Sequence, residues 1–546
     1  MKKLLLFFFI LFFIQFASLK AQAPDWAWAK SAGGTGSEGF YSCATDQFGN
    51  TYVTGFFSSP SITFGATTLT NANAPGDDIL IVKYDAIGNV LWAISAGGNS
   101  NDFAVKITLD TYGNVYIIGY YYSTSITFGT TTFNSSSPGV SDIFVAKYDS
   151  SGNLLWAKSN GGQGDVNGIG ITTDNAGDVY ITGQFGINVD FGGTILTSAG
   201  YQDMFIVKYD SLGNILWAKA AGGTHADSGY DIICDILGNV FVTGKFISPT
   251  ITFGVNILTN NAVSSEDIFL VKYDAAGNVH WATRAGGSGN EYGRSLSADT
   301  LGHVFVTGSC TSPTISFGGT ILTNAGIYDM FIAQYDTSGN ELWCKVVGNL
   351  GADYGRNSTI DGAGNVYITG IYASEHLDFD LTTITNASGG EYDIFIAKYD
   401  VLGNVIWVKS FGGLISDYSQ SIYSDASGNL IVTGYFNSNN IIFNSDTLTN
   451  SNFSSNYSDI FIAKLSNLLV DSKEKITDQT SVFPNPSSGI FMLNDKKNIT
   501  SLEVFNMMGE LVLSQGNAKQ INLQAFPKGI YIARINGMQV CRLVKE

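Results

Sequence analysis

The stretch DIFVAKYDSSGNLLWAKSNGG at residues 142–162 recurs along the chain in related forms and decides its fold. Its tryptophan has six counterparts, and consecutive ones lie 61 to 64 residues apart. The seven are Trp28, Trp92, Trp156, Trp217, Trp281, Trp343 and Trp407. Self-similarity at a fixed period is typical of repeat architectures, so we expect seven units of about 63 residues.

Each unit holds four strand-like runs, which are clearest in the second unit. They cover Val105 to Leu109, Val115 to Tyr120, Ile143 to Tyr148 and Leu154 to Lys158, and are termed A, B, C and D. Thirteen turns joining A to B or C to D read DxxGN or a close variant. In such a turn the Asp accepts backbone N–H groups, and the Gly takes the left-handed position that closes a type I turn with a bulge. Calcium binding is the competing interpretation, but a calcium loop needs alternating ligands and a distal Glu that DxxGN lacks.

Four-stranded units without helices predict an all-β fold, here a seven-bladed β-propeller. The repeats open with a D-type strand, Asp25 to Ser31, that no A, B or C strand precedes. They end at Ile460 to Leu465, a C strand with no D strand after it. We therefore expect the N-terminal strand to close the ring by completing the last blade. A small C-terminal β-sandwich is expected to follow.

Residues 1–21 have the pattern of a secretory signal peptide. Lys2 and Lys3 precede an apolar run from Leu4 to Ile14, and small residues lead to a cleavage site after Ala21. A membrane span takes about 20 apolar residues. The run is shorter than that and no later segment reaches it, so we expect no transmembrane segment in the mature chain. The formal net charge of −18 argues against binding nucleic acid.

Segments such as AGNVYITG at 363–370 and DIFIAKYD at 393–400 resemble SBBP repeats, a class of bacterial β-propeller repeat. The resemblance covers about Asp25 to Leu465 and implies a propeller over residues 22–465. It implies no common activity, because a fold by itself does not define a function.

A different module follows a polar, charged linker at residues 466–480. Within 481–546, FPNPSSGIF at 483–491 and FPKGIY at 526–531 accompany short apolar alternations separated by turn residues, which predict a β-sandwich. This segment resembles the type A sorting domain of the type IX secretion system. The resemblance implies that residues 481–546 bind the secretion machinery and that the protein reaches the exterior or the outer-membrane surface of a Gram-negative bacterium. A carbohydrate-binding sandwich is the alternative.

Known catalytic patterns are missing from the sequence, which has no nucleophile elbow, paired metal motif or phosphate-binding glycine loop. Glycine pairs such as Gly97-Gly98 follow strand D and are expected to let the backbone pass closely between blades. The connections from B to C are expected to form short hairpins that present Ser, Thr and Asn to glycan or protein partners. One Asp starts strand C in every unit and is expected to accept loop N–H groups: Asp78, Asp142, Asp203, Asp267, Asp329, Asp393 and Asp459.

An acidic residue also recurs before strand A in all seven units. The set is Glu38, Asp102, Asp165, Asp227, Glu291, Asp353 and Asp417. Because strand A lines the axis of a propeller, we expect these residues to surround one mouth of the central channel. Two roles are open: each carboxylate ties down its own loop through N–H groups, or the ring binds calcium or another hard cation.

These features predict a secreted or surface-attached propeller that binds or displays without catalysis. A glycan or a surface protein is the expected ligand, and no cofactor other than calcium is implied. The alternative is an extracellular polysaccharide lyase or hydrolase that acts on the propeller face. Tyr292, Arg294, Tyr354 and Arg356 in adjacent units come closest to the nonrepeating cluster that such an enzyme needs.

Overall fold

The computed structural model describes residues 23–453, 457–467, 481–483, 485–494, 501–506, 511–516, 519–535 and 539–545. The predicted signal peptide at 1–21 and residues 468–480 of the predicted linker lie outside this part. Contacts divide the chain into two compact units, Met1–Leu469 and Val470–Glu546. No helix within the described ranges has the length and apolar character to cross a membrane.

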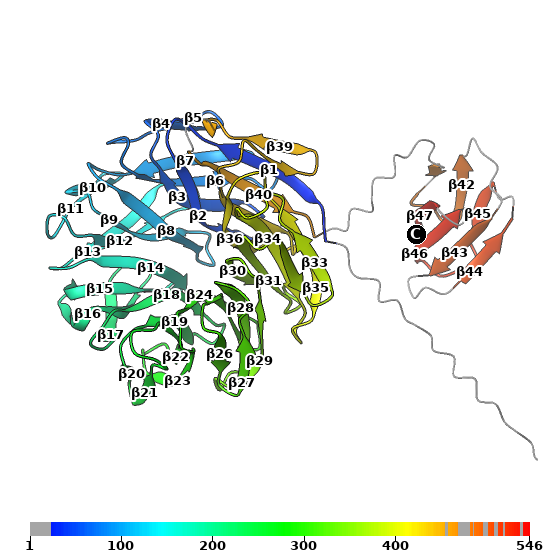
Figure 1. Ribbon diagram of the computed structural model, residues 1–546. Helices are drawn as coiled ribbons and strands as arrows, with labels where there is room; N and C mark the ends of the chain where they lie inside the picture. Colours follow the sequence, from blue (N-terminus) through cyan, green and yellow to red (C-terminus); the bar gives the residue numbers. More distant parts are fainter. Residues whose placement is uncertain are drawn as a thin grey trace, which may run out of the picture. The chain divides into compact units, whose positions relative to one another are not determined.

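The described part of the first unit forms seven four-stranded sheets, which we number as blades 1 to 7 (Figure 1). Strand A of blades 1 to 7 is β2 (Glu38–Thr45), β8 (Asp102–Leu109), β14 (Val166–Thr173), β18 (Asp227–Cys234), β24 (Glu291–Ala298), β30 (Asp353–Ile360) and β36 (Asp417–Ser424). Strand B is β3 (Thr51–Phe57), β9 (Val115–Tyr121), β15 (Val179–Phe191), β19 (Val240–Phe246), β25 (Val304–Cys310), β31 (Val366–Tyr372) and β37 (Leu430–Phe436).

Strands C and D complete each blade in the order predicted. Strand C is β6 (Asp78–Tyr84), β12 (Asp142–Tyr148), β16 (Thr194–Tyr209), β22 (Asp267–Tyr273), β28 (Asp329–Tyr335), β34 (Asp393–Tyr399) and β40 (Asp459–Leu465). Strand D is β7 (Val90–Ala96), β13 (Leu154–Asn160), β17 (Ile215–Ala221), β23 (Val279–Ala285), β29 (Glu341–Val347), β35 (Val405–Phe411) and, in blade 7, β1 (Trp26–Ala32).

Six connections from B to C form the expected short hairpins. They are β4 (Ser61–Phe64) with β5 (Thr67–Thr70), β10 (Ser125–Phe128) with β11 (Thr131–Asn134), β20 (Thr250–Phe253) with β21 (Asn256–Thr259), β26 (Thr314–Phe317) with β27 (Thr320–Thr323), β32 (His376–Phe379) with β33 (Thr382–Thr385), and β38 (Asn440–Phe443) with β39 (Asp446–Thr449). In blade 3 the hairpin is continuous with β15 and β16. The hairpins contact outer strands, as β5 contacts β7, so they lie away from the axis.

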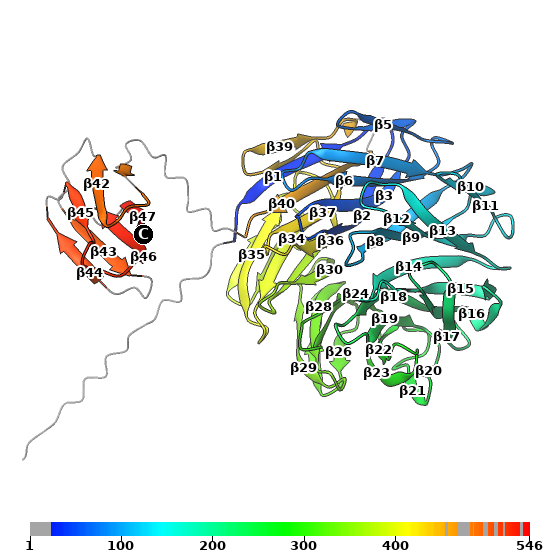
Figure 2. The same cartoon turned by 180° about the vertical axis from the view of Figure 1, so that it is seen from behind.

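The two ends of the propeller pair with each other, as the sequence predicts. β1 runs antiparallel to β40, with Trp28 opposite Lys464 and Ala32 opposite Ile460. The blue strand β1 lies beside the orange strand β40 in both Figure 1 and Figure 2. β36 also contacts β2, which closes the inner ring of A strands. The all-β propeller fold is confirmed.

The DxxGN turns have the predicted geometry. In all thirteen the Gly has a positive φ, between 76° and 87°. Asp85 Oδ1 accepts the N–H groups of Ile87 at 3.0 Å and Asn89 at 2.8 Å. Backbone groups of the same turn therefore satisfy the carboxylate.

The repeated tryptophans join each blade to the next. Trp28 Nε1 donates to the carbonyl of Ala86, 3.2 Å away, in the C-to-D turn of the following blade. Five more make the same bond: Trp92, Trp156, Trp217, Trp281 and Trp343. Trp407 precedes blade 7, whose strand D comes from the chain start, so no C-to-D turn exists there to accept such a bond.

Apolar packing between blades stabilises the ring. The ring contains seven buried apolar clusters, and each combines side chains of two neighbouring blades. In one of them, Ile79 and Ile81 of blade 1 pack with Ile117 and Phe144 of blade 2. Burying one such side chain contributes about 1.5–3 kcal/mol. The inner strands are consequently held from both sides.

The Asp that starts strand C accepts loop N–H groups in all seven blades, as predicted. Asp78 accepts the N–H of Ala72 at 2.6 Å, and the other six distances lie between 2.6 and 2.9 Å. A Cβ on Gly97 would lie 2.1 Å from Asp78 Oδ1. This close approach explains the first glycine of the pair that follows strand D.

The second unit contains two sheets. Their strands are β41 (Ser481–Phe483), β42 (Ile490–Asn494), β43 (Leu502–Asn506), β44 (Leu511–Gln515), β45 (Gln520–Asn522), β46 (Gly529–Ile535) and β47 (Gln539–Lys545). The sheet orders are β41-β42-β45 and β44-β43-β46-β47. Phe491 and Ile521 of the first sheet pack in one cluster with Leu502 and Tyr531 of the second.

Candidate functional site: the axial channel

A β-bulge interrupts strand A of every blade at the same place. Side chains of a regular strand point to the two sheet faces, which in a propeller pack against the neighbouring blades. A bulge re-aims one residue out of this alternation. The bulged residues are Tyr41, Val105, Ile169, Tyr230, Arg294, Arg356 and Gln420. All seven line one cavity of about 250 Å³, which is the axial channel.

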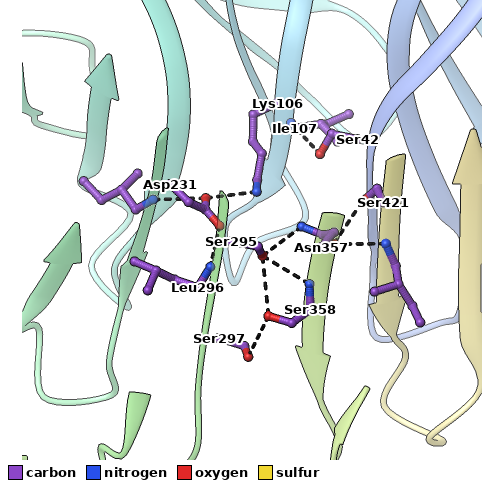
Figure 3. Close-up of polar contacts among 12 residues, drawn as sticks. Ser42, Lys106, Ile107, Asp231, Ser295, Leu296, Ser297, Asn357, Ser358 and Ser421 are labelled. Carbon is purple, nitrogen blue, oxygen red and sulfur yellow. Dashed lines mark hydrogen bonds and ion pairs between the residues drawn. The ribbon is translucent and has the colours of Figure 1, made fainter. Parts of the chain in front are cut away.

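The residues that follow the bulges link neighbouring blades by hydrogen bonds around the axis (Figure 3). Ser295 Oγ accepts the N–H of Ser358 at 3.1 Å. In the same way Asn357 Oδ1 accepts from Ile422 at 3.0 Å, and Ser421 Oγ accepts from Cys43 at 3.3 Å. This polar ring fixes the A strands against one another, and with them the bulged side chains.

The ring is completed differently at blade 3, where the equivalent residue is Gly170. Lys106 of blade 2 reaches past this glycine to Asp231 of blade 4, with Nζ 2.9 Å from Oδ1 (Figure 3). Asp231 Oδ2 also accepts the N–H of Leu296 at 2.9 Å. The positive charge of Lys106 is therefore neutralised within the protein.

Arg294 and Arg356 have no such partner. Within the described part of the chain, no ion pair or hydrogen bond joins either guanidinium to another side chain, and the Nε atom of each is buried without an acceptor. The guanidinium of Arg294 lies 5.6 Å from the ring of Tyr292, and that of Arg356 lies 5.5 Å from the ring of Tyr354. The structure thus brings together the four residues that the sequence singled out.

Half-buried aromatic side chains near the channel form two runs of contacting rings, which we call the aromatic belt. Centroids of successive rings in a run are 4.9 to 6.0 Å apart. The runs are Tyr41, Phe56, Phe103, Tyr120 and Tyr122, then Tyr328, Tyr354, Tyr392, Tyr418 and Tyr435. Tyr41 and Tyr120 also line the channel.

The seven acidic residues before strand A, expected around one mouth of the channel, are not among the residues that line it. Six of them are 0% exposed: Glu38, Asp102, Asp227, Glu291, Asp353 and Asp417. They sit at the regular start of the strand, three residues before the bulge, so their side chains point into their own blade. Each receives hydrogen bonds from the serine 21 residues later, as Asp102 does from Ser123 Oγ at 2.7 Å. The other serines are Ser59, Ser248, Ser312, Ser374 and Ser438.

Asp165 is the exception among the seven. Glycine, not serine, stands 21 residues after it, at Gly186. Its carboxylate instead accepts the N–H of Ser141 in the preceding blade, at 2.9 Å. Blade 3 therefore departs from the pattern at the acid, at the hairpin and at the polar ring.

Burial shifts the acidic residues toward their neutral form. Desolvation raises the pKa of Glu38 and that of Asp102 to about 7, although the serine hydrogen bonds oppose the shift. Desolvation raises the pKa of Asp417 to about 6. In the described ranges no group of three or more His, Cys, Asp or Glu side chains is placed to hold a metal ion. Calcium binding at these seven carboxylates stays a prediction.

Comparison with known proteins adds weak relationships for the propeller. The chain is 23% identical over 499 residues to an uncharacterized WD repeat-containing protein of Acanthamoeba polyphaga mimivirus, and 30% identical over 216 residues to regulatory protein FlaEY of Caulobacter vibrioides. These matches cover 75% and 37% of this chain but only 36% and 22% of the relatives. The structure of the Neurospora crassa Pan2 WD40 domain matches with a TM-score of 0.39 and 9% identity, over 79% of this chain and 90% of that one.

The C-terminal match is to a defined family. Residues 481–545 match the secretion system C-terminal sorting domain. This finding confirms the sorting-domain prediction for that part of the chain and implies contact with the secretion machinery. The chain therefore carries a type IX sorting domain and belongs outside the cell, secreted or attached to the outer-membrane surface of a Gram-negative bacterium.

Proposed function

We propose that the propeller, built from SBBP-type repeats, is an extracellular glycan-binding module that does not catalyse a reaction. The aromatic belt is the observation that carries this proposal. A sugar ring presents C–H groups on its faces and hydroxyls at its edge. Tyrosine offers a matching apolar ring with a polar tip, and ten half-buried aromatic side chains beside one channel provide an extended surface of this kind.

A glycan screen with the secreted full chain tests the proposal. Tyr354→Ala and Tyr418→Ala should each weaken binding of a captured glycan at least tenfold, since each removes a ring from the middle of the belt. Tyr112→Ala is the matched control, because Tyr112 is 77% exposed on a DxxGN turn outside the belt. Equal affinities for the belt variants, the control and the native chain would refute the glycan role.

Catalysis on an acidic polysaccharide is the second candidate, favoured by the arginines and tyrosines that line the channel. Glycoside hydrolysis needs two carboxylic groups at the scissile bond. No Asp, Glu, His or Cys side chain lines the channel in the part of the chain described. Burial raises the pKa of Tyr41 and of Tyr230, so neither phenol gives up its proton readily. Release of reducing ends or unsaturated products from a polysaccharide by the purified chain would favour the enzyme instead.

A further inference from the structure

The two channel arginines are placed for binding an external anion. Arg294 and Arg356 occupy the same bulge position in adjacent blades. Their guanidinium groups rest on tyrosine rings, and both Nε atoms are buried without acceptors. Buried polar groups are nearly always satisfied, so two adjacent exceptions in a cavity call for a ligand that completes them.

The balance of charges in the channel also indicates that an external anion binds there. Lys106 is neutralised by Asp231, and no carboxylate lines the channel among the described residues. Two positive charges are therefore left uncompensated in a half-enclosed space, where unpaired charge is costly. Burial and the neighbouring charge of Arg294 both lower the pKa of Arg356, to about 10. An anion between the two guanidinium groups would relieve the desolvation and the repulsion together.

We propose that Arg294 and Arg356 bind the carboxylate or sulfate group of an acidic saccharide whose sugar rings lie on the aromatic belt. The proposal rests on the glycan role above and names its substrate class. A guanidinium presents N–H donors in a planar fork that matches an oxyanion, and a tyrosine beneath each one holds the fork in place. The formal net charge of the whole chain is −18, so attraction of an anion to this site must come from the local arginines and not from the overall charge.

Calorimetric titration of the secreted full chain tests the site with three probes: an acidic oligosaccharide, a neutral one of the same length, and free sulfate. Two variants are compared with the native chain. One is the double variant Arg294→Gln/Arg356→Gln, and the other is the single variant Arg356→Lys. Arg284→Gln is the matched control, because Arg284 lies on β23 and pairs with Asp267 at 3.2 Å, away from the channel. The double variant should bind the acidic oligosaccharide at least 30-fold more weakly and the neutral one unchanged. Arg356→Lys should show an intermediate loss, since it keeps the charge without the fork.

Other outcomes distinguish the arginine site, the acidic saccharide as its ligand, and the glycan-binding function from one another. Unchanged binding of the acidic oligosaccharide by the double variant overturns the site. Sulfate that binds as tightly as the acidic oligosaccharide overturns the saccharide assignment and leaves a site for small oxyanions. If neither oligosaccharide binds while sulfate raises the melting temperature of the native chain only, the glycan role fails and the arginine site stands.

Discussion

Replacing Arg356 by Gln should stabilise the unliganded protein, although the change shortens a partly buried side chain. Burial, and after it the neighbouring charge of Arg294, lower the pKa of Arg356 from its usual value to about 10. At about 1.4 kcal/mol per pH unit, this fall corresponds to roughly 3 kcal/mol of destabilisation by the charged group. Loss of the contact with Tyr354 costs about 1 kcal/mol. The net gain is therefore about 2 kcal/mol.

The sign of this effect does not depend on pH near neutrality. The depressed pKa still lies well above 7, so the guanidinium is protonated in both the folded and the unfolded state. The destabilisation is therefore constant from acid pH up to about pH 9, and the same gain is expected at pH 6 and pH 8.

Thermal melting in buffer without multivalent anions measures the gain. A rise of roughly 2–4 °C is expected for Arg356→Gln, because 1 kcal/mol shifts the melting temperature of a domain of 150 to 250 residues by about 2–4 °C and the propeller is about twice that size. Arg284→Gln breaks an ion pair and should give no rise. Sulfate or an acidic oligosaccharide should raise the melting temperature of the native chain and so remove its difference from that of Arg356→Gln. If Arg356→Gln melts lower than Arg284→Gln, the arginine is a structural residue and the anion argument fails.

Four further expectations follow from the propeller and its tail. Deleting Asp25 to Ser31 should expose the edge of β40, lower the melting temperature and cause aggregation; a monomeric, equally stable deletion would exclude ring closure by β1. Because burial raises the pKa of Asp102 to about 7, its contribution to stability should be lost progressively as pH rises from about 4 to about 7, by up to about 1.4 kcal/mol per pH unit. The melting temperature of Asp102→Asn should accordingly change less between pH 5 and pH 8 than that of the native chain. Calcium added after chelation should leave the melting temperature unchanged, because serine and glycine donors already form hydrogen bonds to the buried carboxylates. A rise that Asp353→Asn and Asp417→Asn abolish would establish a cation site. Deleting residues 481–546 should leave a folded propeller in the periplasm, and its normal appearance in the medium would contradict the sorting role.

The sequence predicts the parts of the fold that depend on local chemistry. A DxxGN turn, the recurring Asp of strand C, and an unpaired strand at each end of the repeats are all readable without coordinates. The close approach of Gly97 to that Asp became visible only in the structure. The serine partners of the acidic residues leave a further signal in the sequence, because a serine recurs 21 residues after the acid in six of the seven units.

The channel could not be predicted in the same way. The expectation that Glu38 and its six counterparts surround one mouth of the channel rests only on their position just before strand A, which lines the axis. The bulge changes the phase of the strand. A glycine inside a strand often marks a bulge, but glycine stands directly before this one in only four of the seven blades, as Gly355 does. A one-residue change of phase decides which side chains meet at the axis. The sequence therefore places Arg294 and Arg356 at corresponding positions in adjacent units, but it does not place their side chains in the channel.

The contrast between repeating and varying positions also indicates where specificity resides. Trp, Gly, Asp and Ser recur from blade to blade because each solves the same packing problem in every unit. A ring of seven identical side chains would offer the same chemistry in every direction, whereas a sugar is asymmetric. The bulge position is structurally equivalent in all blades, yet it holds Tyr, Val, Ile, Tyr, Arg, Arg and Gln in order around the ring. It combines the rigidity of a repeated scaffold with a unique arrangement of charge and shape, which is what recognition of one asymmetric anionic ligand requires.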